Sequence, residues 1–229
     1  MTSLLLPVIV GALIVGLFVW LIVRQRAQVR AERAALERFG FRPCPDKQSW
    51  LDETVARLES NSRYTFAVHD PLQLDHNPAV YYYSKTRTRQ LHTSEDNPLK
   101  VEEILFPLTR RSTDGVMLIV KPSALKPGLA TDLIGLMASG PWDAQPEDLE
   151  KIEIPIELAD SNVVQAFGPR AGSLTELVDV KSLDALKDVG DSGATFVQCR
   201  DGWCAVSGMS KKGFQVEDIV NRIKPLLRH

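Results

Sequence analysis

Residues 196–208 read "FVQCRDGWCAVSG", two β-rich runs on either side of an Asp-Gly pair. An Asp-Gly pair between such runs is the usual sequence of a two-residue turn in a β-hairpin. If the flanking residues pair directly, Cys199 stands opposite Cys204 on the neighbouring strand. The stretch therefore predicts an antiparallel hairpin near the carboxyl end, with its two thiols facing each other.

Comparable β-rich runs lie upstream, at residues 63–68, 79–89, 102–108 and 115–122. They are rich in aromatic and β-branched residues, and Asp-Pro, Asn-Pro and Asp-Gly pairs stand between them. Such punctuation favours short connections between neighbouring strands. We expect these runs to form an antiparallel sheet.

Apolar residues at helical spacing predict helices beside this sheet. The clearest begins at Ser49, with Asp52 three residues later as a capping pair and with Trp50, Leu51, Val55 and Leu58 directed inward. The other predicted elements are helices at residues 127–140 and 214–227, a strand at 152–158, and short helices around 162–168 and 173–180.

These elements predict an α+β fold, in which the soluble region is one domain or two small, similar α+β units. A lone transmembrane helix and a polar stalk are expected to precede it. The predicted boundaries are a transmembrane anchor at residues 1–23, an arginine-rich helical stalk and linker at 24–48, a first α+β unit at 49–141 and a second at 142–229.

The expected anchor is the run from Leu4 to Val23, which contains no charged residue. A helix of this length, at about 1.5 Å per residue, matches a bilayer core of about 30 Å. Arginines follow the run and none precedes it, so the positive-inside rule predicts a single-pass cell-membrane protein with its N-terminus outside and its C-terminal domain in the cytoplasm. The bilayer is then the first predicted partner.

Two groups of cations are candidates for contact with an anionic surface. The first follows the apolar run, and the second extends the aromatic strand "YYYSKTRTRQ", on which alternate residues share one face. The candidates are Arg24, Arg26, Arg30, Arg33, Lys85, Arg87 and Arg89. Anionic lipid, an acidic protein and nucleic acid remain open as ligands of the second group.

The amino-terminal segment also carries patterns compatible with a homodimer. Ile22, Val29 and Leu36 recur every seven residues, as in one column of a coiled coil. Ala12 and Gly16 form a pair of small residues four positions apart, which permits close approach of two helices.

The cysteine pair admits three interpretations: a reduced pair that flanks a turn, a regulatory or structural disulfide, and a metal site. Cys199 and Cys204 would form a non-hydrogen-bonded pair, whose separation permits a cross-strand disulfide. A structural zinc site needs two more ligands, and a dithiol oxidoreductase usually has a C-x-x-C motif at a helix start. Neither feature is present in the sequence.

The segment "HDPLQLDH" contains the other candidate ligands, His69, Asp70, Asp75 and His76. These side chains could surround a divalent metal if the loop folded back on itself. The alternative is that Asp-Pro and Asn-Pro turns account for the polar residues. This loop is the basis of one enzymatic hypothesis, a membrane-tethered metal-dependent hydrolase.

The formal net charge of −2 gives no overall attraction to nucleic acid. Walker, Rossmann and HExxH motifs are absent from the sequence, and no nucleophile, base and electrophile converge in a recognisable pattern. We therefore expect no cofactor and a non-enzymatic module that binds another protein or organises an assembly. A redox-responsive module acting through Cys199 and Cys204 remains an alternative.

Overall fold

The computed structural model describes residues 5–60, 63–89, 99–108, 115–121, 147–154, 156–158, 161–169, 189–208 and 215–224. The chain divides into two units, Met1–Gly40 and Phe41–His229.

The first unit contains a single long helix, α1 (Leu5–Phe39). The helix ends at Gly40, whose φ of 107° is open to glycine and strained for other residues. Its backbone N–H donates to the Glu37 carbonyl, and this bond closes the last turn. Between Val15 and Val23 the described side chains of α1 are apolar and exposed.

No helix in the described part of the chain combines the length and the apolar character needed to cross a membrane. This finding contradicts the predicted transmembrane helix at residues 4–23, and with it the single-pass membrane location and its orientation.

The second unit is built mainly of β-strands. Its elements are β1 (Phe41–Pro43), η1 (Pro45–Lys47), α2 (Gln48–Glu59), β2 (Tyr64–Leu74), β3 (Asn77–Arg89), β4 (Leu99–Pro107), β5 (Val116–Val120), β6 (Glu150–Ile152), η2 (Ile156–Leu158), β7 (Val163–Gly168), η3 (Val189–Ser192), β8 (Phe196–Arg200), β9 (Trp203–Gly208) and α6 (Val216–Ile223).

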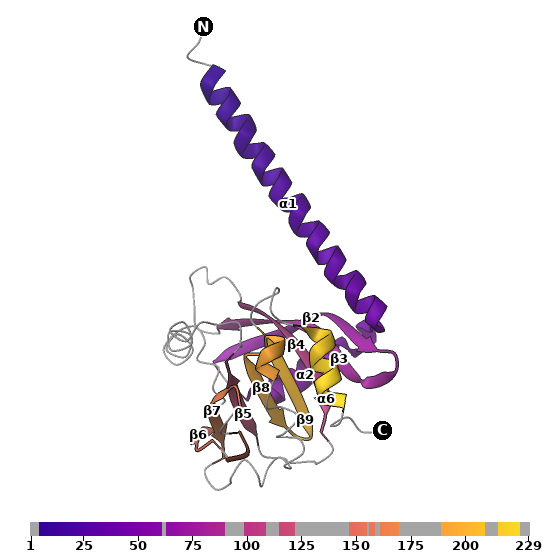
Figure 1. Ribbon diagram of the computed structural model, residues 1–229, viewed down its shortest axis with the longest axis vertical. Coiled ribbons are helices and arrows are strands. Elements are labelled where there is room, and N and C mark those ends of the chain that lie inside the picture. The colour runs from indigo at the N-terminus through magenta and orange to yellow at the C-terminus, as the bar shows by residue number, and fades with distance from the viewer. Residues whose placement is uncertain are drawn as a thin grey trace. The chain divides into compact units, whose positions relative to one another are not determined.

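All nine described strands belong to one sheet in the order β1-β2-β3-β4-β9-β8-β5-β7-β6, shown in Figure 1. Each neighbouring pair is antiparallel. The predicted α+β class with a transmembrane helix is therefore wrong: the described residues form a single nine-stranded antiparallel sheet with a few helices. The antiparallel arrangement itself is confirmed.

The β8–β9 hairpin lies inside the sheet, between β4 and β5. Asp201 and Gly202 have φ values of 52° and 78°, as a type I′ turn requires. Cys199 pairs with Cys204 in the register that the sequence predicts. The hairpin is confirmed, and its central position ties the carboxyl part of the chain to the strands that precede it.

Helix α2 packs on one face of the sheet. Leu51, Val55 and Leu58 are buried against Tyr81 and Tyr83 of β3, which confirms the predicted inward side of this helix. The predicted Ser49 cap is absent, because the helix begins at Gln48 and no side chain caps its start. Instead, a carboxylate oxygen of Asp52 accepts a 2.8 Å hydrogen bond from the backbone N–H of Val68, so the residue attaches α2 to β2.

The helix predicted around residues 162–168 is wrong, because this segment is β7. Its ladders to β5 and β6 hold it in extended form, and such distant pairings override a weak local preference. The strand predicted at 152–158 ends at Ile152, and η2 follows. The helices predicted at 127–140 and 173–180 lie outside the described residues.

The predicted division between residues 141 and 142 also lies outside the described residues. Strands from the two sides of this boundary alternate in the sheet, with β9 and β8 between β4 and β5. The division stays a prediction.

Candidate functional site

β6 stands at one end of the sheet and is attached to β7 by a short ladder. Lys151 pairs with Phe167, and Ile152 pairs with Ala166. Ile152 also lies across Gly168, where an added Cβ would stand 3.0 Å from the Ile152 Cδ1 atom. The glycine therefore lets the isoleucine rest on the neighbouring strand. Among the described strands, none pairs with the outer side of β6.

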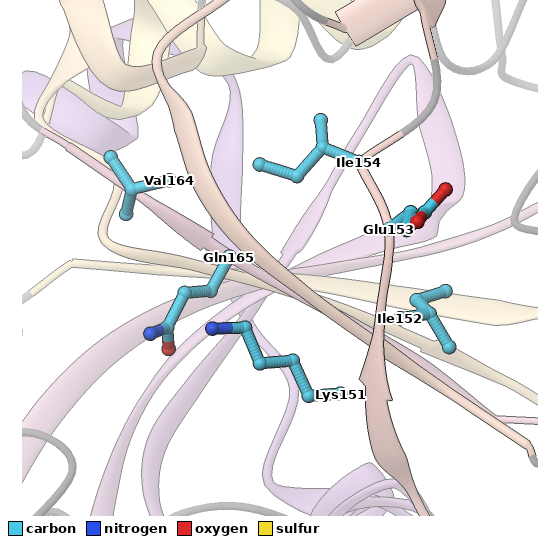
Figure 2. Close-up of a pocket in the computed structure, with 6 residues that line it drawn as sticks. All are labelled: Lys151, Ile152, Glu153, Ile154, Val164 and Gln165. Carbon is cyan, nitrogen blue, oxygen red and sulfur yellow. The ribbon is translucent and has the colours of Figure 1, made fainter.

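A cavity of about 440 Å³ lies where the chain leaves β6. On its β7 side, Val164 is the extra residue of a β-bulge, because Ile119 of β5 pairs with Gln165 and Val120 pairs with Val163. A bulge interrupts the ladder and re-aims the side chains beside it. The lining residues, drawn in Figure 2, are Lys151, Ile152, Glu153, Ile154, Val164 and Gln165.

The cavity combines aliphatic walls with polar groups of three kinds. In Figure 2 the Lys151 ammonium and the Gln165 amide point toward each other, and Ile154 is directed toward Val164. Glu153 adds a carboxylate to the lining. The volume falls within the range of roughly 300–1,000 Å³ typical of ligand sites, and an apolar lining with a few polar groups is their usual composition.

Two isoleucines extend the apolar surface beyond β6. Ile154 is 36% exposed and Ile156 is 85% exposed, whereas the other large exposed hydrophobic side chains described in the chain belong to α1. Single exposed apolar residues are common on proteins, but these two continue directly from an edge strand. Lys151 and Glu153 are exposed beside them. The edge can thus offer backbone hydrogen bonds, apolar contacts and a pair of opposite charges.

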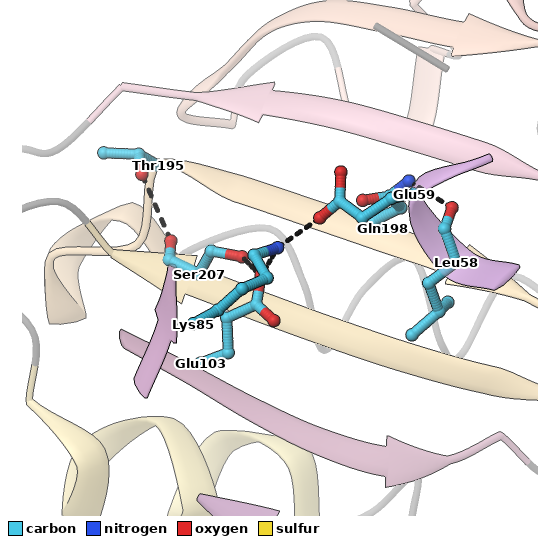
Figure 3. A network of polar contacts seen from close by, with 7 residues as sticks. All are labelled: Leu58, Glu59, Lys85, Glu103, Thr195, Gln198 and Ser207. Carbon is cyan, nitrogen blue, oxygen red and sulfur yellow. Dashed lines mark hydrogen bonds and ion pairs between the residues drawn. The ribbon is translucent and has the colours of Figure 1, made fainter. Parts of the chain in front are cut away.

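A buried polar cluster lies beneath α2, in the middle of the sheet (Figure 3). The Lys85 ammonium donates to carboxylate oxygens of Glu59 on α2 and Glu103 on β4. The Ser207 hydroxyl donates to the same Glu103 oxygen at 2.6 Å. The Gln198 amide donates to the Leu58 carbonyl and so satisfies one of the last carbonyls of the helix. We define Glu59, Lys85, Glu103, Gln198 and Ser207 as the buried polar cluster.

Burial and neighbouring charges act in opposite directions on these groups. Burial raises the pKa of Glu59 above its ordinary value, and Lys85 offsets this only in part. Burial lowers the pKa of Lys85, but the combined effect of Glu103 and Glu59 is larger and leaves this pKa raised. Burial and the adjacent Glu103 carboxylate raise the pKa of Tyr83 well above its usual value. Lys85 therefore remains an ammonium at neutral pH.

The structure places the two cysteines of the hairpin side by side. The Sγ atoms of Cys199 and Cys204 are 2.7 Å apart, and both residues are buried. Both are free thiols, as is Cys44. Burial and the neighbouring Cys199 raise the pKa of Cys204 well above its usual value, and burial raises that of Cys44 to about 11. The disulfide remains a prediction.

The predicted metal-binding loop is spread over β2 and the turn after it. His69 Nε2 lies 2.8 Å from the Thr86 hydroxyl, and Asp75 forms a 2.9 Å ion pair with Arg42. Asp70 lies in a β-bulge with a φ of 51°, and His76 lies in the following turn. Within the described ranges, no three His, Cys, Asp or Glu residues are grouped so that they could hold a metal ion.

The predicted cationic groups differ in their exposure. Arg24, Arg26, Arg30 and Arg33 are exposed on α1. Arg24 lies 5.1 Å from the ring centre of Trp20, and Arg33 pairs with Glu37 at 3.4 Å.

The second group lies on β3, where Lys85 and Arg87 are both buried. The Arg87 guanidinium is 4.1 Å from the centre of the Tyr64 ring. Arg89 is the last residue of β3, and its side chain lies outside the description. Lys85 and Arg87 are therefore not presented to a ligand on the surface.

The sequence reasoning missed the β6 edge. The segment "KIEIPIEL" alternates charged and apolar residues as an exposed strand does, but this pattern alone predicts only an ordinary strand of a second unit. Its position at the end of the sheet depends on the pairing of β7 with β5, which the local sequence does not specify. Pro155, which follows Ile154, was the available signal, because proline is largely confined to edge strands and strand ends.

Comparison with family models, curated proteins and solved structures finds no match to this chain.

The Lys85→Met substitution is expected to destabilise the fold by about 3–5 kcal/mol, because it leaves two buried carboxylates without their shared cation. Chemical denaturation measures this change in the free energy of unfolding. Replacing the carboxylates as well, in Lys85→Met/Glu59→Gln/Glu103→Gln, should restore much of the loss. The control Arg42→Met removes an exposed ion pair and should cost less than about 1 kcal/mol. A Lys85→Met variant no less stable than this control would contradict the assignment.

Glu59 should give the stability a definite dependence on pH. Because the pKa of Glu59 is raised in the folded state, its contribution is fully present below its pKa in the unfolded chain, near 4.5, and is lost as pH rises through the folded pKa. The free energy of unfolding of the native chain, relative to Glu59→Gln, should therefore fall from pH 4 toward neutral pH. Urea denaturation at a series of pH values measures the difference; an unchanged or rising difference would refute the prediction.

Proposed function

We propose that this chain is a non-enzymatic protein-interaction module that binds an extended polypeptide segment along β6. The proposal rests on one observation, the end position of β6 in the sheet next to the exposed Ile154 and Ile156. An edge strand can extend its ladder to a second chain, and peptide binding by strand addition uses this chemistry.

The side chains around β6 supply selectivity for such a segment. In strand addition the backbone bonds give affinity, while pockets for alternate side chains distinguish one sequence from another. The cavity beside β6 has aliphatic walls formed by Ile152, Ile154 and Val164. The exposed Lys151 and Glu153 favour a partner with an acidic and a basic residue at matching positions. The expected ligand is an extended segment in which apolar and charged residues alternate.

The alternative of a metal-dependent hydrolase that uses the segment from His69 to His76 has less support from the positions of these side chains. Its candidate ligands already have other partners, since His69 contacts Thr86 and Asp75 pairs with Arg42. The buried polar cluster offers carboxylates and an ammonium, but Glu59, Lys85 and Glu103 are buried and bonded to one another. A catalytic group must reach its substrate, so these buried groups do not support the hydrolase alternative.

A library of displayed random peptides, selected against the full-length chain, tests the proposal. Enriched peptides should alternate apolar and charged residues. Their dissociation constants, measured by fluorescence anisotropy, should rise at least tenfold for Ile156→Asp, because the substitution places a charge in the apolar contact. The matched control is Val29→Asp, which alters an aliphatic side chain that is 44% exposed in α1. This control should bind within about twofold of the native chain.

If no peptide is enriched above the level seen in a selection without the protein, the result would count against the proposed interaction module. Equal affinity of the native chain and Ile156→Asp would remove β6 from the binding site.

A second candidate function is redox response through Cys199 and Cys204, favoured by their direct pairing and the 2.7 Å between their Sγ atoms. Oxidised glutathione would accept two electrons and two protons from these thiols, so that one protein disulfide forms and two glutathione thiols are released. In a glutathione redox buffer brought to equilibrium, the count of free thiols should fall from three to one and return with dithiothreitol. A count of free thiols that stays at three would exclude this pair as the switch. So would a loss of two free thiols in the Cys204→Ser variant, because that variant lacks one member of the pair.

A further inference from the structure

We propose that the cavity beside β6 binds a carboxylate carried on an aliphatic chain, with the Lys151 ammonium and the Gln165 amide as its hydrogen-bond donors. The inference rests on the proposed function in treating this edge as a binding site, and it names the chemistry of the group that the cavity takes. The carboxylate can belong to the bound polypeptide or to a free aliphatic acid, because the same side chains would recognise both.

The lining side chains lie on two sides of the β6 backbone. In Figure 2, the side chains of Lys151 and Ile154 extend toward β7, whereas those of Ile152 and Glu153 lie on the other side. Strict alternation along a strand would put residues 151 and 154 on opposite faces. The alternation stops because Ile152 is the last residue of β6 and the bulge at Val164 lies beyond the paired residues. A cation and an aliphatic side chain therefore face the cavity together.

Two polar groups point toward each other in the cavity, the Lys151 ammonium and the Gln165 amide (Figure 2). Among the described residues, none forms an ion pair or a hydrogen bond with either of these side chains. A lysine ammonium has donors only, and a glutamine amide can present its NH2 group. A ligand shared by the two must therefore be an acceptor. The positive charge favours an anion, because charge-assisted hydrogen bonds are stronger than neutral ones.

The charges around the cavity favour an anion with a single negative charge. Among the described lining residues, Lys151 is the only cation and Glu153 is the only anion. One ammonium balances one carboxylate, whereas a phosphate group carries more than one negative charge at neutral pH and would also meet the Glu153 carboxylate. Phosphate sites usually supply arginines or successive backbone N–H groups. The lining is therefore better matched to a carboxylate than to a phosphate.

The remainder of the ligand should be aliphatic. Ile154 and Val164 form an apolar wall of the cavity, and Figure 2 shows Ile154 directed toward Val164. Each methylene group that this wall removes from water should strengthen binding by up to about fourfold. A glutamate side chain has this composition, and so do a free aliphatic acid and a polypeptide that ends in an aliphatic residue. In a strand added to β6, the residue opposite Lys151 directs its side chain to the same face and can reach the cavity.

An NMR titration of the full-length chain with sodium hexanoate tests the inference. We expect a dissociation constant on the order of millimolar, because so small a ligand makes few contacts. Hexanamide has the same shape without the charge and should bind at least tenfold more weakly. Lys151→Met should weaken hexanoate binding at least tenfold. The matched control Lys47→Met alters an exposed lysine of η1 and should bind within about twofold of the native chain.

Three results would overturn the carboxylate site. The first is equal affinity of the native chain for hexanoate and hexanamide. The second is equal affinity of Lys151→Met and Lys47→Met for hexanoate. The third is tighter binding of inorganic phosphate than of hexanoate, which would contradict the class of ligand.

Competition distinguishes the two sources of the carboxylate. Hexanoate that displaces the peptides selected against the chain would identify the polypeptide as the source, provided that one change to those peptides weakens their binding at least tenfold. That change is glutamine in place of glutamate, or an amidated C-terminus. Hexanoate that binds without displacing the peptides would identify a free acid.

The outcomes also separate this inference from the proposed function. Hexanoate binding that depends on Lys151, together with no enriched peptide, would support the carboxylate site and count against the interaction module. Peptide binding that is lost in Ile156→Asp, together with no preference for hexanoate over hexanamide, would support the module and overturn the carboxylate site.

Discussion

The Lys85 ammonium joins two carboxylates that come from different parts of the fold, Glu59 at the end of α2 and Glu103 in the middle of the sheet. Removing charges from water is costly unless they are paired in good geometry, so these three groups stay buried only if α2 and β3 and β4 keep their relative positions. The apolar contacts of α2 would tolerate small shifts of the helix, whereas the ion pairs would not. The cluster thus specifies where the helix lies, and the hydrophobic surface around it supplies the bulk of the burial.

The same cluster connects the helix to the inserted hairpin. Ser207 of β9 donates to Glu103, and Gln198 of β8 donates to the last turn of α2. Trp50 of α2 contacts Trp203 at the start of β9, with ring centres 5.1 Å apart. The hairpin is consequently fixed on three sides: by β4, by β5 and by α2 above it. This rigid centre contrasts with β6, which the described strands support on one side only.

Local chemistry accounts for the parts of the fold that the sequence predicts correctly. The Asp-Gly turn fixes the pairing of Cys199 with Cys204, and the spacing of Leu51, Val55 and Leu58 identifies the buried side of α2. Features that depend on distant partners were predicted poorly. The residues of β7 predict a short helix, whereas their extended form comes from pairing with β5 and β6.

For the candidate sites, too, features set by distant parts of the chain were not predicted from the sequence. Lys85 and Arg87 have the sequence pattern of a cationic surface along a strand, but both are buried: Lys85 contacts Glu59 of α2, and Arg87 lies over the ring of Tyr64. The carboxylates that neutralise Lys85 lie 26 and 18 residues away in the chain, at distances where sequence patterns carry no pairing information. The β6 edge is likewise a property of strand order. The prediction of a membrane anchor relied on the length of an uncharged run and on the arginines that follow it, and it is contradicted by the helices that the structure describes.

The central position of the carboxyl-terminal hairpin has a consequence for synthesis of the chain. Ser207 meets Glu103 across 104 residues of sequence, and β4 and β5 have no direct ladder to each other. Until β8 and β9 have left the ribosome, the sheet therefore exists as two separate parts, with the inner edges of β4 and β5 unpaired. Open edges of this kind attract other strands, so a nascent or truncated chain carries a risk of aggregation. In the complete sheet β8 and β9 cover these two edges.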